Sequence, residues 1–407
     1  MDISVLNEIA ILAGGSGGRR ELSVMSDLEI MAVVPVEENY DKLVTLFMVE
    51  AKRVGIHIDA INKPTRRKGS IATTVQELVD NVFLNGLDEV QVSMLIEASV
   101  VAGNLKVEHE LKETIETYMG TPLSDVPVRK RSQQSQIDLF MKGEQVNPEK
   151  DVLFGDFVQM NMENWKLLKA TSNMEVLRQI ASGKKTTFDI KKDLYRGIQT
   201  SIQLLSYYAS REEVPSASGG SSGMSKVSSP PAGSALRSTK AEVVPKRKVR
   251  QVTKSATLET LAKCSRLGKL GSTCGMMELR TVVGLRVAAH NYHGVENDKV
   301  MFQSEKAVHE KESRETMSTA EEGGGVQAKS RVDLGALDVG HDTPSFPIPP
   351  AMVPNVYKAI ALSGALQETW MILSSGTRIN ERDNFLETFD SVFSKKIAEW
   401  NAICHIK

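Results

Sequence analysis

The sequence predicts an α+β protein, in which a small mixed sheet near the N-terminus is followed by a helical domain with disordered inserts. Three observations predict this class. The first 62 residues alternate short apolar runs with a glycine-rich stretch and one amphipathic segment. Further along, apolar residues recur at intervals of three and four, which is the period of a helix. Two segments rich in Ser, Gly, Pro or charged residues cannot bury enough apolar surface to offset the entropy of ordering.

The N-terminal part is expected to be an α/β unit. IAILA at 9–13 is predicted to form a strand or a helix, and DLEIMAVV at 27–34 and GIHIDAI at 55–61 are predicted to form strands. GGSGG at 14–18 is predicted to form a loop between the first two segments. The amphipathic run at 40–54 is predicted to form a helix.

Helical patterning covers most of the remaining chain, beginning with a helical region from residue 73 to about 119. The last two predicted helices are expected to form a closing hairpin. The runs that carry the pattern are 74–84, 90–103, 165–181, 195–209, 257–271, 276–294, 354–373 and 384–400.

These elements divide the chain into an α/β domain, a helical domain and a C-terminal helical hairpin. The expected boundaries are 1–120, 151–302 and 351–407, with a loop at 121–150. The segment 211–255 is predicted to be a disordered linker within the helical domain, and 303–350 a second one. The first linker ends in the basic cluster KRKVR, which is interpreted as solvated chain rather than a nucleic-acid patch.

Composition excludes several classes of protein. The 50 basic and 51 acidic residues nearly cancel, so net charge does not favour nucleic acid as a partner. No window resembles a membrane span, and no secretory signal opens the sequence. The three cysteines show no metal-type spacing. We therefore expect a cytoplasmic protein with neither a membrane nor a nucleic acid as partner.

Two carboxylates stand out in the second predicted strand. Asp27 and Glu29 are the only charged residues of 27–34, and residues two apart in a strand share a face. Two carboxylates on one face suit a hard divalent cation, because Mg²⁺ is often held by one or two carboxylates plus substrate phosphates. The glycines of 14–18 let backbone amides approach phosphate oxygens closely, and Ser16 adds a donor. The two signals together predict a site for a metal-bound triphosphate.

Each signal also has a plainer interpretation. GGSGG lacks the Gly-Lys-Ser/Thr of a P-loop, and Arg20 stands where the dinucleotide motif needs its last glycine, so the stretch can be a simple flexible turn. Asp27 and Glu29 can be solvent-facing residues of an edge strand. His57 is interpreted as a packed strand histidine rather than a general base.

The stretch GGSGGRREL followed by SDLEIM resembles the signature of the polymerase-β-like nucleotidyltransferase superfamily. The version is similar to that of PII-protein uridylyltransferases and of related nucleotidyltransferases attached to CBS or cyclic-nucleotide-binding domains. Further segments resemble later parts of the family in the same order, among them MLIEASVVAGN at 94–104 and FDIKKDLYRGIQTSIQLLSYYA at 188–209. The matching segments are scattered from about residue 9 to 300.

The sequence departs from the family at several positions. Glu29 stands where the family usually has Asp, and Asp193 and Leu194 occupy places often given to glycine. No His-rich hydrolase signature follows, since the GHD of 340–342 lacks further ligands. A uridylyl-removing activity and a C-terminal ligand-sensing module are therefore not expected.

The resemblance implies a nucleotidyltransferase domain at 1–120 that moves a nucleoside monophosphate from a nucleoside triphosphate, such as ATP or UTP, to a hydroxyl of a protein or small molecule. It implies Mg²⁺ or Mn²⁺ held by Asp27 and Glu29, with Asp59 as a third catalytic and metal carboxylate. The rival interpretation of Asp59 is a cap on the following turn. The residues expected to contact the nucleotide are Gly14, Gly15, Ser16, Arg19, Arg20, Lys191 and Arg196.

Plainer roles remain open for the cations. A salt bridge to Glu21 or a helix surface is the alternative for Arg19 and Arg20, and a solvated helix face is the alternative for Lys191 and Arg196. At the level of the whole protein, the alternative to an enzyme is a catalytically degenerate relative that binds nucleotide or a partner and regulates by conformation.

Overall fold

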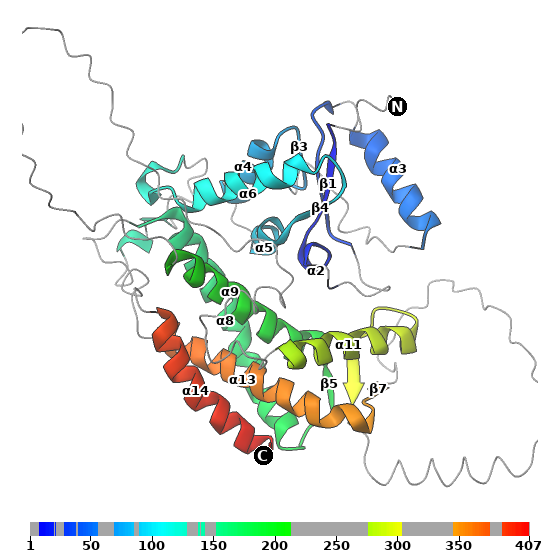
Figure 1. The fold of residues 1–407 in the computed structure, drawn as a ribbon, viewed down its shortest axis with the longest axis vertical. Helices are drawn as coiled ribbons and strands as arrows, with labels where there is room; N and C mark the ends of the chain where they lie inside the picture. The colour runs from blue at the N-terminus through cyan, green and yellow to red at the C-terminus, as the bar shows by residue number, and fades with distance from the viewer. Residues whose placement is uncertain are drawn as a thin grey trace, which may run out of the picture.

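The computed structural model describes residues 8–19, 21, 28–37, 40–55, 69–84, 89–127, 137–138, 140–142, 152–212, 276–302, 345–374 and 385–406. A sheet region at the N-terminus is followed by a mostly helical part that contains a second small sheet (Figure 1). The mixed α+β class and the order of its two parts are confirmed. The predicted helix at 257–271 and most of the two predicted linkers lie outside the described residues.

The N-terminal sheet has four strands in the order β3-β2-β1-β4. Strand β1 is antiparallel to both of its neighbours, whereas β2 is parallel to β3, so the sheet is mixed as predicted. The strands are β1 (Ala10–Ala13), β2 (Ile30–Val33), β3 (Ile71–Ala72) and β4 (Ser99–Gly103).

Both faces of β1 and β2 are buried. Ile11 and Ile30 belong to a smaller apolar cluster that includes residues of α3 (Tyr40–Arg53). Leu12 and Met31 belong to the main core, which extends through the helices on the other face. Because successive strand residues point to opposite faces, burial on both sides requires a continuous apolar run, and this is what the sequence shows there.

The region from 73 to 119 is only partly helical. Helices α4 (Val75–Phe83), α5 (Glu89–Glu97) and α6 (Lys106–Met119) are present, but β4 replaces the end of the helix predicted at 90–103. The prediction was wrong there because the stretch pairs with β1 and ends at Gly103. That glycine has φ +90°, and a Cβ on it would lie 2.0 Å from the Ile9 carbonyl oxygen.

Two further differences concern the glycine stretch and the third strand. Gly15–Gly18 forms a short helical turn, α2, rather than an irregular loop. Residues 56–68, which include most of the predicted third strand, lie outside the described residues. The strand that pairs with β2 in the described part of the chain is β3.

The helical part is built around α13 (Val353–Ser374), which is buried on most sides by its neighbours. The pair α13 and α14 (Phe385–Ile403) forms the predicted hairpin, and the helices run antiparallel because Gly364 meets Trp400 whereas Trp370 meets Phe389. The other long helices are α8 (Phe154–Ala181), α9 (Arg196–Glu212) and α11 (Met276–His293).

A second sheet, which the sequence did not predict, lies beside α11. Strand β6 (Lys299–Met301) is antiparallel to β5 (Thr187–Asp189) and parallel to β7 (Phe346–Pro347). Between β5 and α9 runs a π-helical turn, η5 (Ile190–Tyr195). Strand β7 falls within the segment 303–350 that the sequence predicts to be a linker.

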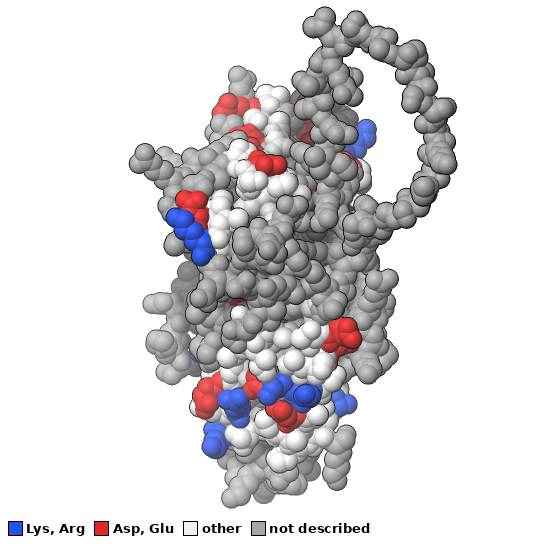
Figure 2. All heavy atoms as spheres, turned by 90° about the vertical axis from the view of Figure 1, so that its left-hand side faces the viewer, with Lys and Arg blue, Asp and Glu red and all other residues white. Residues whose placement is uncertain are grey.

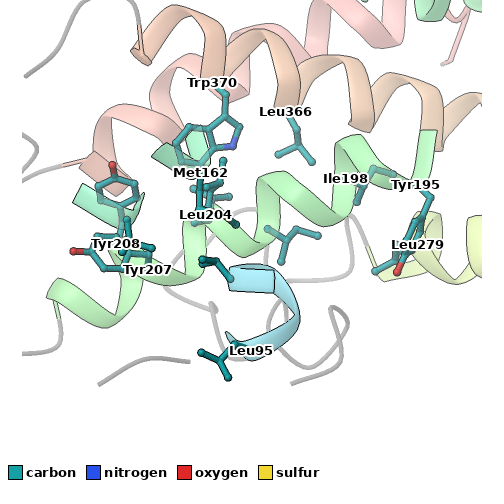
Figure 3. Close-up of a cluster of buried hydrophobic side chains, with 14 of the residues drawn as sticks. Leu95, Met162, Tyr195, Ile198, Leu204, Tyr207, Tyr208, Leu279, Leu366 and Trp370 are labelled. Carbon is teal, nitrogen blue, oxygen red and sulfur yellow. The ribbon is translucent and has the colours of Figure 1, made fainter. Parts of the chain in front are cut away.

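One core joins the two parts. Figure 3 shows Leu95 of α5 below α9, with Leu366 and Trp370 of α13 on the opposite side of that helix, and all three belong to the main apolar cluster. None of the described helices has both the length and the apolar character needed to cross a membrane.

Candidate functional site

The glycine turn lies against the residue that precedes β2. The Gly14 amide donates to the Glu29 carbonyl at 2.9 Å. Gly15 has φ +51°, and a Cβ on it would lie 2.1 Å from Glu29 Oε2. The half-buried Glu29 carboxylate therefore lies next to the turn. Folding brings together the glycines and one of the two acids that the sequence singled out.

The turn is packed on its other side. A Cβ on Gly18 would lie 2.1 Å from the Glu97 carbonyl oxygen and 2.8 Å from that of Ala13. The Ser99 hydroxyl also donates to the Gly18 carbonyl at 3.2 Å. The close backbone approach requires glycine here, and it argues against the interpretation of the stretch as merely a flexible turn.

No side chain caps α2 at Gly14. The first amides of a helix have no acceptor within the helix, so those of Gly15 and Ser16 can donate to a group placed at the turn. The other predicted metal ligands, Asp27 and Asp59, and the predicted phosphate contact Arg20 lie outside the described residues, as does His57.

Arg19, the residue after α2, is buried and forms three side-chain contacts. Its Nε donates to Glu21 at 2.8 Å, its Nη1 to Glu97 at the end of α5, and its Nη2 to the Tyr195 hydroxyl at 3.0 Å. The salt bridge to Glu21 is one of the alternatives that the sequence left open. Although burial lowers the pKa of Arg19, the neighbouring Glu97, Tyr195 and Glu21 raise it well above its ordinary value, so the guanidinium stays charged.

Tyr195 lies at the end of the π-helical turn and is 3 % exposed. Its hydroxyl donates to Glu21 while it accepts from Arg19. Burial raises the pKa of Tyr195 far above its ordinary value, and the proximity of Glu21 adds to this although Arg19 acts in the opposite direction. The hydroxyl therefore remains a proton donor.

The predicted phosphate contacts of the helical part lie in different surroundings. Lys191 is half-buried, and its Nζ forms an ion pair with Glu296 at 2.6 Å. Arg196 is exposed at the start of α9, as expected for a solvated helix face. Lys191 thus belongs to an ion-pair network, whereas Arg196 is open to solvent.

A second buried polar cluster lies between α11 and β6. The side chains of His290, Glu296 and Asp298 bring one potential metal ligand each within 4.8 Å of one another. However, Arg286 donates to Asp298 at 2.7 Å and to Glu296 at 3.2 Å, and Lys191 adds a second positive charge at Glu296. Because two cations already balance the two carboxylates, we interpret the cluster as an ion-pair network rather than a metal centre.

Tyr195 joins the two polar groups. The Arg19 guanidinium lies 5.9 Å from the centre of its ring and the Arg286 guanidinium 5.5 Å. Sequence reasoning missed Glu97, Tyr195 and Arg286. Glu97 and Tyr195 lie within the segments 94–104 and 188–209 that the sequence analysis singled out, but a pattern along the chain does not tell which distant side chains meet.

Charges of both signs lie side by side on one part of the described surface. On the face drawn in Figure 2, Lys and Arg side chains of the lower part lie beside Asp and Glu side chains. This local mixture agrees with the near-neutral net charge of the sequence.

Comparison of the sequence with protein-family models and with curated proteins gives no match.

Proposed function

We propose that this protein is a metal-dependent nucleotidyltransferase. It transfers a nucleoside monophosphate from a nucleoside triphosphate to a hydroxyl of a protein or small molecule, in the manner of the uridylyltransferases that its sequence resembles. The observation that carries the proposal is the placement of the Glu29 carboxylate beside the left-handed Gly15. The glycine turn proposed to bind phosphate and the carboxylate proposed to bind the metal lie at one end of a small mixed sheet.

The one proposed ligand among the described residues, the Glu29 carboxylate, fits a hard divalent cation, because Mg²⁺ and Mn²⁺ prefer carboxylate oxygens. Asp27 and Glu29 would hold the ion, and Asp59 is the proposed third carboxylate. When bound, the ion supplies charge neutralisation at the triphosphate.

The protein's own groups bind and orient the nucleotide. Backbone amides of Gly14–Ser16 approach the β- and γ-phosphates; the Gly14 amide would exchange its bond to Glu29 for this contact, whereas those of Gly15 and Ser16 need no such exchange. The Ser16 hydroxyl is a further donor, and Arg20 is proposed as a cationic contact. Arg196, exposed on α9, is the better of the two proposed contacts from the helical part, since Lys191 is paired with Glu296.

The second candidate is a degenerate relative that binds nucleotide and regulates by conformation. A specific observation favours it, because two of the expected phosphate contacts, Arg19 and Lys191, are bonded to carboxylates of the protein. Glu29, with a longer side chain than the usual Asp, points in the same direction.

Calorimetry with each of the four nucleoside triphosphates tests the proposal. We expect one or more to bind with Mg²⁺ or Mn²⁺ and none to bind in EDTA, because phosphates and carboxylates repel at close range. Equal affinity in EDTA would contradict the metal-bridged site.

Variants then separate the two candidates. Asp27→Asn and Glu29→Gln should abolish transfer of the nucleoside monophosphate to an acceptor in cell lysate. Transfer is detected by mass spectrometry of the labelled products. The control Glu110→Gln changes an exposed carboxylate on α6 and should have no effect. Metal-dependent binding without any transferred nucleotide would favour the regulatory protein.

A further inference from the structure

We propose that Tyr195 is a positioning residue, which holds the glycine turn in place through Arg19. The inference rests on the proposed function in one respect, since it takes the turn as the nucleotide site. It goes further, because it infers that contacts from the helical part fix the conformation of the glycine turn.

The Arg19 guanidinium is held by three residues. Each of its three nitrogen atoms donates a hydrogen bond to a different residue, namely Glu21, Glu97 or Tyr195. All four residues are at least 90 % buried. A planar fork held from three directions in a buried setting has little freedom to move.

Backbone hydrogen bonds link Arg19 to the turn. Arg19 follows α2 directly, and its amide donates to the Gly15 carbonyl at 3.1 Å. The Gly18 amide donates in turn to Gly14 at 3.0 Å. Because these hydrogen bonds join Arg19 to Gly15, a displacement of Arg19 would also displace Gly15, the residue beside the Glu29 carboxylate.

Tyr195 is anchored in the helical part. It ends the π-helical turn, a form that is rare in proteins and often found at functional sites. The guanidinium groups of Arg19 and Arg286 lie 5.9 Å and 5.5 Å from the centre of its ring, and Arg286 donates a hydrogen bond to Asp298. Gln199, one turn further on α9, donates to the second oxygen of Glu97 at 2.8 Å. The helical part thus forms hydrogen bonds with both Arg19 and its carboxylate partner Glu97.

Tyr195→Phe tests the proposal, because it removes the hydroxyl and keeps the ring. Hydrogen exchange is measured on the peptide that contains Gly14–Arg19, without nucleotide. Loss of a hydrogen bond between a neutral and a charged group should make exchange at the turn roughly tenfold faster. Calorimetry with Mg²⁺ and the nucleoside triphosphate that binds the unaltered protein should show a dissociation constant roughly tenfold higher.

Tyr207→Phe is the matched control. Tyr207 is also 3 % exposed, and its hydroxyl donates to the buried Asp156 at 2.9 Å, between α9 and α8. This variant should lose a similar amount of overall stability and leave exchange at the turn and nucleotide affinity unchanged. If Tyr195→Phe fails to fold, Glu21→Gln takes its place. It weakens both the Tyr195 contact and the Arg19 contact to the same Glu21 oxygen, so unchanged exchange at the turn in this variant also overturns the proposal.

Unchanged exchange at the turn in the Tyr195 variant would overturn the proposal, and so would equal acceleration in the Tyr207 variant. If the unaltered protein binds none of the four triphosphates, the proposed function fails. The exchange comparison needs no nucleotide, so it still decides whether Tyr195 holds the turn.

Discussion

Gly18 offers a sharp test of the packing at the turn, through the substitution Gly18→Ala. The new Cβ would lie 2.1 Å from the Glu97 carbonyl oxygen and 2.8 Å from that of Ala13. Both atoms are backbone, so relief requires α5 or β1 to move rather than a side chain to rotate. Overpacking of this kind costs up to about 3 kcal/mol. With a urea slope of about 2 kcal/mol/M, the unfolding midpoint should fall by up to about 1.5 M.

Gly284→Ala is the control for this measurement. Gly284 lies exposed within α11, and a Cβ there meets nothing within 4 Å. Alanine in a helix interior is more favourable than glycine by about 0.5–1 kcal/mol, so the midpoint should rise slightly. The measurement is urea unfolding followed by circular dichroism. If Gly18→Ala loses less than about 1 kcal/mol relative to the unaltered protein, the close approach of the turn to Glu97 is refuted.

Gly15→Ala should cost only about 1 kcal/mol of stability, because the strain comes from the left-handed φ and the atom that the new Cβ meets, Glu29 Oε2, is the end of a flexible side chain. The substitution should nevertheless weaken the binding of Mg²⁺-nucleotide at least about tenfold, as measured by calorimetry. Retained affinity would contradict the proposed site. Burial raises the pKa of Asp298, but the hydrogen bond from His290 and the charge of Arg286 outweigh it and lower the pKa below the ordinary value. The ionised Asp298 carboxylate therefore stabilises the fold above about pH 4, and this stabilisation is lost as the pH falls through the folded-state pKa. Asp298→Asn should be less stable than the unaltered protein at pH 7, and its urea midpoint should depend less on acid pH. An identical pH profile of the two proteins would exclude a stabilising role of the Asp298 charge. Burial raises the pKa of Cys404 to about 11. Iodoacetamide at pH 8 should therefore modify this thiol in urea but not in the native protein, which site-resolved mass spectrometry measures. Rapid labelling of the native protein would contradict the burial of the thiol.

Local pattern was enough for the elements whose environment is uniform along their length. The apolar residues 30–34 predicted β2, because a strand buried on both faces is apolar at every position. The amphipathic run at 40–54 predicted α3, because its apolar residues recur with the period of a helix. The hairpin of α13 and α14 was predicted for the same reason. The roles of all the predicted site residues stay predictions, and Asp27, Arg20 and Asp59 also lie outside the described residues.

Local pattern failed where pairing decides the structure. The run at 90–103 has helical spacing throughout, but its end is a strand because β1 offers an edge there and Gly103 allows a close backbone approach. The strands β5, β6 and β7 are two or three residues long, which is too short for any period to be read.

For the site, the sequence by itself determined which residue types are available, and it placed the glycines and Glu29 together correctly because only a short segment separates them. The tertiary structure decided what the cations do. Arg19 lies five residues beyond the first glycine of the turn, which suggested a phosphate contact, but its guanidinium is bonded to Glu97 and Tyr195, 78 and 176 residues away. A buried charge is stable only where carboxylates and hydroxyls converge on it, and that convergence exists only once the sheet and the helical part have packed together.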